Sequence, residues 1–198
     1  MTPLTPPTSS PPPGLLERLA DRAAAEGLLD VAYAAVDSPL GTLVAARTPR
    51  GLAALAYADV NGGVDAVAQQ LAARLSPRVL EAPARLDDVR RELDEYFEGR
   101  RTRFELPLDL SAVATPFGRR VLEAAAAIPF GQTRTYRDVA ADAGNARAIR
   151  AAGSALGRNP VPIVVPCHRV LRSGGGLGGY TGGMERKAAL LRIEGVLP

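Results

Sequence analysis

Three short apolar runs follow one another between residues 31 and 57, and turn residues separate them. The runs are Val31–Val36, Thr42–Arg47 and Gly51–Tyr57. Ser38-Pro39-Leu40-Gly41 separates the first two, and Thr48-Pro49-Arg50-Gly51 separates the second and third. Short runs divided by such turn residues favour neighbouring antiparallel strands. We therefore expect a small antiparallel meander at the centre of the first half of the chain.

Helical patterns flank this meander. Apolar residues fall on one stripe of a helix over residues 15–28, and helices are also expected over Gly63–Leu75 and Leu86–Phe97. A short extended run is expected near Arg103–Leu106. Strands and helices mixed in this order favour an α/β domain, which we place at residues 29–110.

The chain of 198 residues begins with a segment unlike the rest. Residues 1–14 contain six prolines, and such a composition cannot bury enough apolar surface to order itself, so we expect a disordered tail. We interpret the predicted helix at 15–28 as an N-terminal extension. No apolar run is long enough to span a membrane, and the first residues lack the layout of a signal peptide. We expect a soluble, cytoplasmic protein without membrane contact.

The second half is predicted to be mostly helical, as one domain over residues 115–198. The pattern predicts a helix over Pro116–Ile128, then a helix over Tyr136–Ala143 that Thr135 can cap. A short glycine-containing turn leads to a further helix over Ala146–Leu156. This spacing is that of a helix-turn-helix motif with the last helix in the recognition position. The same pattern also fits an αα-hairpin in a core.

Positive charge is concentrated in this second half. The formal net charge is +3, but 12 Arg and 16 acidic residues up to Ala114 give −4, whereas 11 Arg, one Lys and 5 acidic residues after it give +7. No acid occurs between Gly144 and Arg172, where Arg147 and Arg150 share a face of the predicted recognition helix. Clustered guanidinium groups favour phosphate or nucleic-acid binding. The alternative is compositional bias, because 23 of the 24 basic residues are Arg.

The only thiol and the only imidazole of the chain are adjacent, as Cys167 and His168. One Cys and one His exclude an internal disulfide and the usual zinc sites, so we expect no metal. The β-branched run Ile163–Val165 predicts a buried extended segment that presents the thiol, and Arg169 would favour the thiolate. Neighbours on an extended chain point to opposite faces, so a relay through water suits this pair. A buried structural Cys and a packed His are the alternatives.

Two further features accompany the Cys-His pair. Glu194 ends a predicted helix over residues 183–192, where the helix dipole disfavours an acid unless a partner stabilises it. It could orient His168, or it could be a solvated last-turn acid. The loop Ser173–Gly183 has seven glycines in eleven residues, and Tyr180 and Thr181 within it could contact a ligand as part of a lid. A flexible linker is the alternative.

The chain resembles the O6-alkylguanine-DNA alkyltransferases. The resemblance rests on Pro166-Cys167-His168-Arg169-Val170, with Asn159-Pro160 before it and the glycine loop and Glu194-Gly195 after it. Upstream it includes Phe130-Gly131, Tyr136, Gly144-Asn145, Arg150, Asp94-Glu95-Tyr96-Phe97 and the 38–43 segment, so it covers about 165 of the 198 residues. It implies a ribonuclease-H-like α/β domain followed by a winged-helix-like domain with a helix-turn-helix.

The resemblance also implies a reaction without a cofactor. Cys167 would take the alkyl group from guanine O6 irreversibly, as a methylated-DNA–protein-cysteine methyltransferase that acts once. His168 would deprotonate the thiol through a water, and Glu194 would orient His168. Asn159 would hold the turn that carries the thiol, and Tyr136 would donate a hydrogen bond or proton to guanine N3.

The remaining implied roles concern DNA and base recognition. Arg150 would fill the gap that a flipped base leaves. Phosphate or sugar contacts are implied for four residues, Gly118, Arg137, Asn145 and Ser173, and Tyr136 is also implied to bind DNA. The flipped guanine would meet a third set: the Thr181 backbone, Tyr180 and the carbonyls of Cys167 and Val170. The partner is duplex DNA containing O6-alkylguanine. The chain is expected to be a monomer in solution and to bind DNA at the nucleoid. Whether several copies bind DNA cooperatively stays open.

Two other functions fit part of these features. A damage sensor would bind alkylated bases without transferring the group. A Cys-His hydrolase would need an oxyanion hole and repeated turnover, and it would leave the arginine-rich helix without a role.

Overall fold

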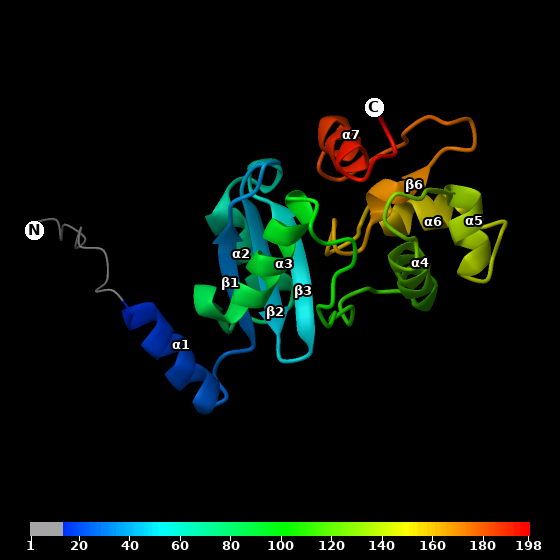
Figure 1. The fold of residues 1–198 in the computed structure, drawn as a ribbon. Coiled ribbons are helices and arrows are strands. Elements are labelled where there is room, and N and C mark those ends of the chain that lie inside the picture. The colour runs from blue at the N-terminus through cyan, green and yellow to red at the C-terminus, as the bar shows by residue number, and fades with distance from the viewer. Residues whose placement is uncertain (1–13) are drawn as a thin grey trace, which may run out of the picture.

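The computed structural model describes residues 14–198, so the expected tail lies almost entirely outside the described residues. Helix α1 (Leu15–Ala25) comes first and ends three residues before the predicted limit, with Gly27 at φ +69°. Ala20 of α1 is buried, and Asp21 accepts a hydrogen bond from Arg85 at 2.9 Å. Figure 1 shows α1 at the margin of the molecule, far from the C-terminal half. Within residues 14–198, no helix is both long enough and apolar enough to cross a bilayer.

A four-stranded sheet forms the centre of the N-terminal half. Its strands β1 (Val31–Val36), β2 (Leu43–Thr48), β3 (Gly51–Tyr57) and β4 (Val79–Glu81) lie in the order β3-β2-β1-β4. The first three form the predicted antiparallel meander. Strand β4, which was not predicted, pairs with β1 in parallel and makes the whole sheet a mixed one. Three residues are too few to show an alternating pattern in the sequence.

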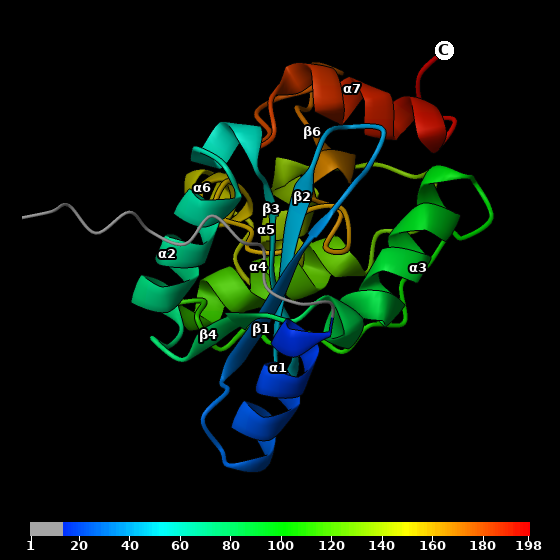
Figure 2. The same cartoon turned by 90° about the vertical axis from the view of Figure 1, so that its left-hand side faces the viewer.

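Helices cover both faces of this sheet. Helix α2 (Val64–Arg74) packs on one face through Val67 and Leu71, and α3 (Asp87–Phe97) packs on the other through Val89 and Leu93. Figure 2 shows the sheet edge-on between them. Short 3₁₀ helices, η1 (Asp59–Asn61) and η2 (Pro83–Leu86), precede α2 and α3.

The extended run predicted near Arg103–Leu106 does not form a strand. The chain instead meets the sheet a little later, where Leu108 makes a single bridge to Leu52 of β3. This contact is too short to form a fifth strand.

The C-terminal half is helical, as predicted. Its helices are α4 (Pro116–Ala126), α5 (Tyr136–Asp142), α6 (Ile149–Leu156) and α7 (Met184–Ile193). A two-stranded parallel pair, β5 (Arg134–Thr135) and β6 (Val170–Leu171), and the 3₁₀ helix η3 (Cys167–Arg169) complete it. Helices α4, α5 and α6 pack on one another, which is the arrangement of a helix-turn-helix with one supporting helix.

Two helix starts show how local residues set these boundaries. Thr115 caps α4 by accepting the Gly118 amide at 3.0 Å, and Thr135 forms a reciprocal capping box with Asp138. Helix α6 begins three residues later than predicted, because Asn145 accepts the Arg147 amide at 3.1 Å and closes a turn there.

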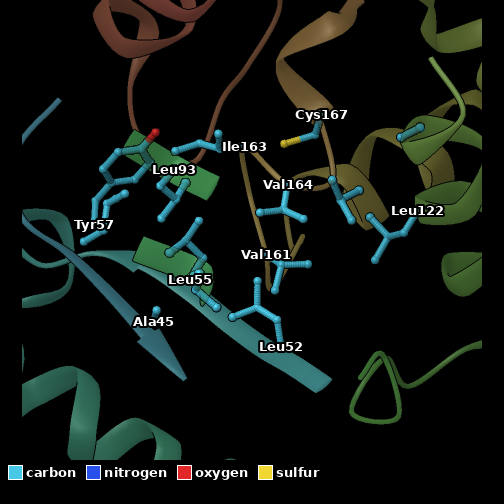
Figure 3. Packing of buried hydrophobic residues seen from close by; sticks show 14 of the residues in the cluster. Ala45, Leu52, Leu55, Tyr57, Leu93, Leu122, Val161, Ile163, Val164 and Cys167 are labelled. Carbon is cyan, nitrogen blue, oxygen red and sulfur yellow. The ribbon is translucent and has the colours of Figure 1, made fainter. Parts of the chain in front are cut away.

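One apolar cluster continues from the sheet into the C-terminal half. Side chains of β3 pack there against the segment that leads to the thiol, as Figure 3 shows. The labelled members from the two sides are Leu52, Leu55 and Tyr57 on β3, and Val161, Ile163, Val164 and Cys167 beyond α6. The thiol therefore belongs to the packed region that joins the two halves.

Candidate active site

A tight buried turn presents the thiol. The prediction of an extended segment over Ile163–Val165 is wrong, although the burial is confirmed. The Val165 amide donates to the Val161 carbonyl at 2.9 Å, and Ile163 has a left-handed φ of +74°. That conformation is costly for a β-branched residue and must be held by its surroundings. Buried Asn159 holds it, donating through Nδ2 to the Val165 carbonyl at 2.7 Å and accepting the Val161 amide at 3.1 Å.

The thiol and the imidazole then lie on one turn of 3₁₀ helix, η3, where successive side chains point in different directions. Cys167 is 5% exposed, whereas His168 is fully buried. His168 Nε2 lies 2.8 Å from Glu194 Oε1. Among the described residues, the other ring nitrogen, Nδ1, has no hydrogen-bond partner although it is buried. A buried polar atom of this kind calls for a partner from outside the protein.

Glu194 is the centre of the buried polar network, at the C-terminal end of α7. Besides His168, its carboxylate accepts hydrogen bonds from Tyr96 Oη at 2.7 Å and from Arg169 Nε and Nη2, both at 2.8 Å. Burial alone would raise the pKa of Glu194, but the hydrogen bonds and charges of His168 and Arg169 outweigh it and lower that pKa to about 2. The expectation that a partner stabilises this acid is confirmed. Arg169 therefore binds Glu194, and the expectation that it acts on the thiol is not supported by these contacts.

Lys187 of α7 carries the charge that acts on the thiol. Its ammonium is buried and donates to the Val170 carbonyl at 2.6 Å. Burial lowers the pKa of Lys187 to about 8. Among residues 14–198, no carboxylate forms a salt bridge with it. Lys187 is the sole lysine of the chain, a signal that sequence reasoning overlooked.

The protonation states follow from these surroundings. Burial raises the pKa of the Cys167 thiol, while the Asn159 side chain and the Lys187 charge act in the opposite direction. Burial also lowers the pKa of His168, and Glu194 offsets this only in part. His168 is therefore neutral at pH 7. Since ionised Glu194 accepts from Nε2, the proton sits on Nε2 and Nδ1 is left as a base.

The thiol borders a pocket of about 240 Å³ between α5, α6 and the glycine loop. Its lining consists of Tyr136, Gly153, Leu156, Gly157, Cys167, Gly179, Tyr180 and Thr181. The glycine loop thus closes over the pocket as expected. A Cβ at Gly178 would lie 2.7 Å from the Tyr136 hydroxyl, and its φ is +70°, so this position requires glycine.

Other predicted site residues lie outside this pocket. Arg150, Arg147, Arg137, Asn145 and Ser173 are exposed, and within residues 14–198 neither Arg147 nor Arg150 forms a salt bridge. Gly118 is buried with its amide engaged by Thr115, and Val170 does not line the pocket.

The fold and the site define a class: a ribonuclease-like α/β domain joined to a helix-turn-helix domain that carries a buried Cys-His-Glu arrangement. Residues 31–110 match the family domain described as "6-O-methylguanine DNA methyltransferase, ribonuclease-like domain", and residues 116–196 match its "DNA binding domain". The chain belongs to the 6-O-methylguanine DNA methyltransferase family, which confirms the resemblance and the two-domain fold expected from the sequence.

Individual relatives agree with this assignment. The methylated-DNA–protein-cysteine methyltransferase of Methanosarcina barkeri is 35% identical over 162 residues, covering 82% of this chain and 96% of its own. The constitutive methylated-DNA–protein-cysteine methyltransferase of Bacillus subtilis is 39% identical over 165 residues, covering 82% of this chain and 94% of its own. The crystal structure of Mycobacterium tuberculosis OGT in complex with DNA has a TM-score of 0.71 at 36% identity, covering 84% of this chain and 95% of that one.

Proposed function

We propose that this chain repairs DNA directly, by moving an alkyl group from guanine O6 in duplex DNA to the sulfur of Cys167, once per chain. The observation that carries the proposal is the sole thiol at the wall of a pocket, beside a buried base that ionised Glu194 orients. The names of the relatives, methylated-DNA–protein-cysteine methyltransferases, support the same reaction. The pocket is smaller than most sites for drug-sized ligands, and its size suits a single base.

The chemistry requires one proton transfer and one displacement. A bridging water carries the thiol proton to His168 Nδ1, the buried nitrogen that has no partner among the described residues. The sulfur attacks the alkyl carbon, an S–C bond forms as the C–O6 bond breaks, and the electron pair passes to guanine. Guanine takes up a proton in exchange, so the balance is one thiol hydrogen for one alkyl group. Lys187 favours the thiolate that the attack needs.

The transfer ends the activity of the chain. A thioether has no good leaving group, and the chain contains no second thiol that could accept the alkyl group. Product accumulation therefore stops at one alkyl group per chain.

The base is recognised from several sides of the pocket. Tyr136, Tyr180 and Thr181 all line the pocket. Tyr136 donates to guanine N3 as guanine departs from the alkyl group, and the Thr181 backbone contacts O6. The Cys167 carbonyl accepts from the exocyclic amine. The Val170 carbonyl lies outside the pocket lining and accepts from Lys187, but it has a second lone pair and is the further acceptor that the family resemblance implies.

A base inside a duplex cannot reach this pocket, so it is flipped out at a cost of a few kcal/mol. Arg150, exposed at the start of α6, fills the gap, and the small residues of that helix allow close approach to the backbone. Arg137, Asn145 and Ser173 are exposed and contact phosphates or sugars. The protein is a monomer in solution and acts on DNA at the nucleoid in the cytoplasm.

Stoichiometry separates this function from a damage sensor. An excess of duplex containing O6-methylguanine is incubated with the wild type and with Cys167→Ser, and the restored guanine is counted by chromatography. The wild type should restore one guanine per chain and then stop, while Cys167→Ser binds the duplex but restores none. Binding without any restored guanine in the wild type would favour the sensor, and repeated turnover would refute the proposal.

A further inference from the structure

Strand β3, at the edge of the sheet, makes two hydrogen bonds to the C-terminal domain in addition to its apolar packing. The Leu55 amide donates to the Pro160 carbonyl at 2.8 Å, next to the asparagine that holds the thiol turn. Two residues on, the Tyr57 hydroxyl lies 3.0 Å from the Tyr180 hydroxyl, and the two rings meet edge-on at 6.2 Å. In Figure 3 the Tyr57 hydroxyl points away from the strands. Strand β3 therefore contacts both the segment that leads to the thiol turn, through a backbone amide, and the glycine loop, through a side chain.

Tyr57 is itself held firmly. Its side chain is 2% exposed, and the Arg186 guanidinium lies over its ring at 4.4 Å. Arg186 donates to the Leu40 carbonyl at 2.8 Å and to Asp59 at 2.7 Å, which ties it to the N-terminal domain. A Cβ at Gly182 would lie 2.4 Å from a ring carbon of Tyr57, so the glycine loop fits closely against this ring.

Tyr180 needs such a support. It belongs to the loop of seven glycines, and a backbone rich in glycine has many accessible conformations. Yet its ring lines the pocket and stands edge-on to His168 at 6.3 Å. Among the described residues, its only side-chain hydrogen bond is the one to Tyr57. The orientation of this pocket wall is therefore set by the other domain.

We propose that Tyr57 is a positioning residue for alkyl transfer, which fixes Tyr180 across the domain interface and so keeps the pocket in its reactive shape. This inference rests on the proposed function. It assigns the ribonuclease-like domain an indirect part in the reaction, through Tyr180, because Tyr57 itself does not line the pocket.

Tyr57→Phe tests this role because it removes only the hydroxyl. Single-turnover rates on O6-methylguanine duplex are measured against protein concentration, which separates the limiting rate from the apparent dissociation constant. The limiting rate should fall about three- to tenfold, the effect of losing one hydrogen bond, with an unchanged dissociation constant. The limiting rate of Tyr180→Phe should fall by the same factor, and that of the double variant should fall no further. Tyr33→Phe is the matched control, because Tyr33 is half-buried on β1 of the same domain and forms no side-chain hydrogen bond among residues 14–198.

A second readout does not depend on DNA. Iodoacetamide alkylates the Cys167 thiolate with loss of iodide, and intact mass follows the reaction. Freeing Tyr180 should open the pocket and speed this alkylation at least about threefold in Tyr57→Phe, but not in Tyr33→Phe. Wild-type rates in both assays, or losses that multiply in the double variant, would overturn the inference. A wild type that reacts with iodoacetamide but never with DNA would instead refute the proposed function.

Discussion

Tyr96→Phe probes the hydrogen bond that joins the two domains beneath the site. Tyr96 of α3 donates to Glu194 of α7 at 2.7 Å, and the two residues are 0% and 4% exposed. Burial and the Glu194 charge raise the pKa of Tyr96, so the hydroxyl keeps its proton throughout the usual pH range. The phenylalanine ring keeps the contacts with its aromatic neighbours, whose centroids lie 5.3–6.1 Å away. The substitution therefore removes one hydrogen bond and little else.

The expected loss follows from the charge of the acceptor. A hydrogen bond to a charged group contributes about 1.5–3 kcal/mol, and a chain of this length changes its Tm by about 2–4 °C per kcal/mol. The free energy of unfolding should fall by that amount, and Tm by roughly 3–12 °C. Urea unfolding at pH 7 measures this loss in free energy. Circular dichroism serves as the probe, because the chain has no tryptophan whose fluorescence could be used.

Two comparisons make this result specific. Tyr33→Phe should stay within about 0.5 kcal/mol of the wild type, since it removes no buried contact. In a Glu194→Gln background, Tyr96→Phe should cost only about 1 kcal/mol, because the acceptor is then neutral. Should Tyr96→Phe be as stable as Tyr33→Phe, the buried network would not join the domains as described.

Three other predictions concern DNA and the buried lysine. Arg150→Ala should slow repair in duplex DNA at least about tenfold while leaving the reaction with free O6-benzylguanine unchanged, because a free base leaves no gap to fill; equal losses would contradict the role. Arg147→Ala should lower the salt dependence of DNA binding by about one phosphate contact, without this selective loss, and a flat salt profile in the wild type would contradict the basic face. Lys187→Met should slow transfer about tenfold for each unit by which the thiol pKa rises. The fall of the Lys187 pKa from 10.5 to about 8 on folding corresponds to about 3 kcal/mol of lost stability at pH 7. The variant also loses the hydrogen bond to the buried Val170 carbonyl, which offsets about 1–2 kcal/mol of this, so Lys187→Met should gain about 1–2 kcal/mol in unfolding free energy at pH 7. That gain should vanish as the pH rises from about 8 towards 10.5, and a pH-independent difference would contradict it.

Local signals account for the parts of the fold that the sequence predicts well. The meander strands were set by turn residues, and Thr115 and Thr135 begin helices through their own side chains. Strand β4 had no such signal, because it is short and exists through its pairing with β1. The turn at Ile163 contradicts the local preference of a β-branched run, because buried Asn159 and the packing against β3 override that preference.

The site residues also fall into two groups, those with a local signal in the sequence and those without one. Cys167 and His168 are adjacent in the sequence, and Glu194 was conspicuous as an acid at a helix end. Tyr96 and Tyr57 gave no comparable signal, because their roles depend on contacts with residues 98 and 123 positions away. Such pairings arise only when the two domains pack together.

The central claim is that Cys167 becomes the permanent carrier of the alkyl group. Intact-mass analysis after incubation with an O6-methylguanine duplex, followed by peptide mapping, tests this most directly. The account predicts a mass gain of one methyl group in place of one hydrogen on every active chain, confined to the peptide that contains Cys167. An unchanged mass in a protein that has restored guanine, or a methyl group on another peptide, would contradict it.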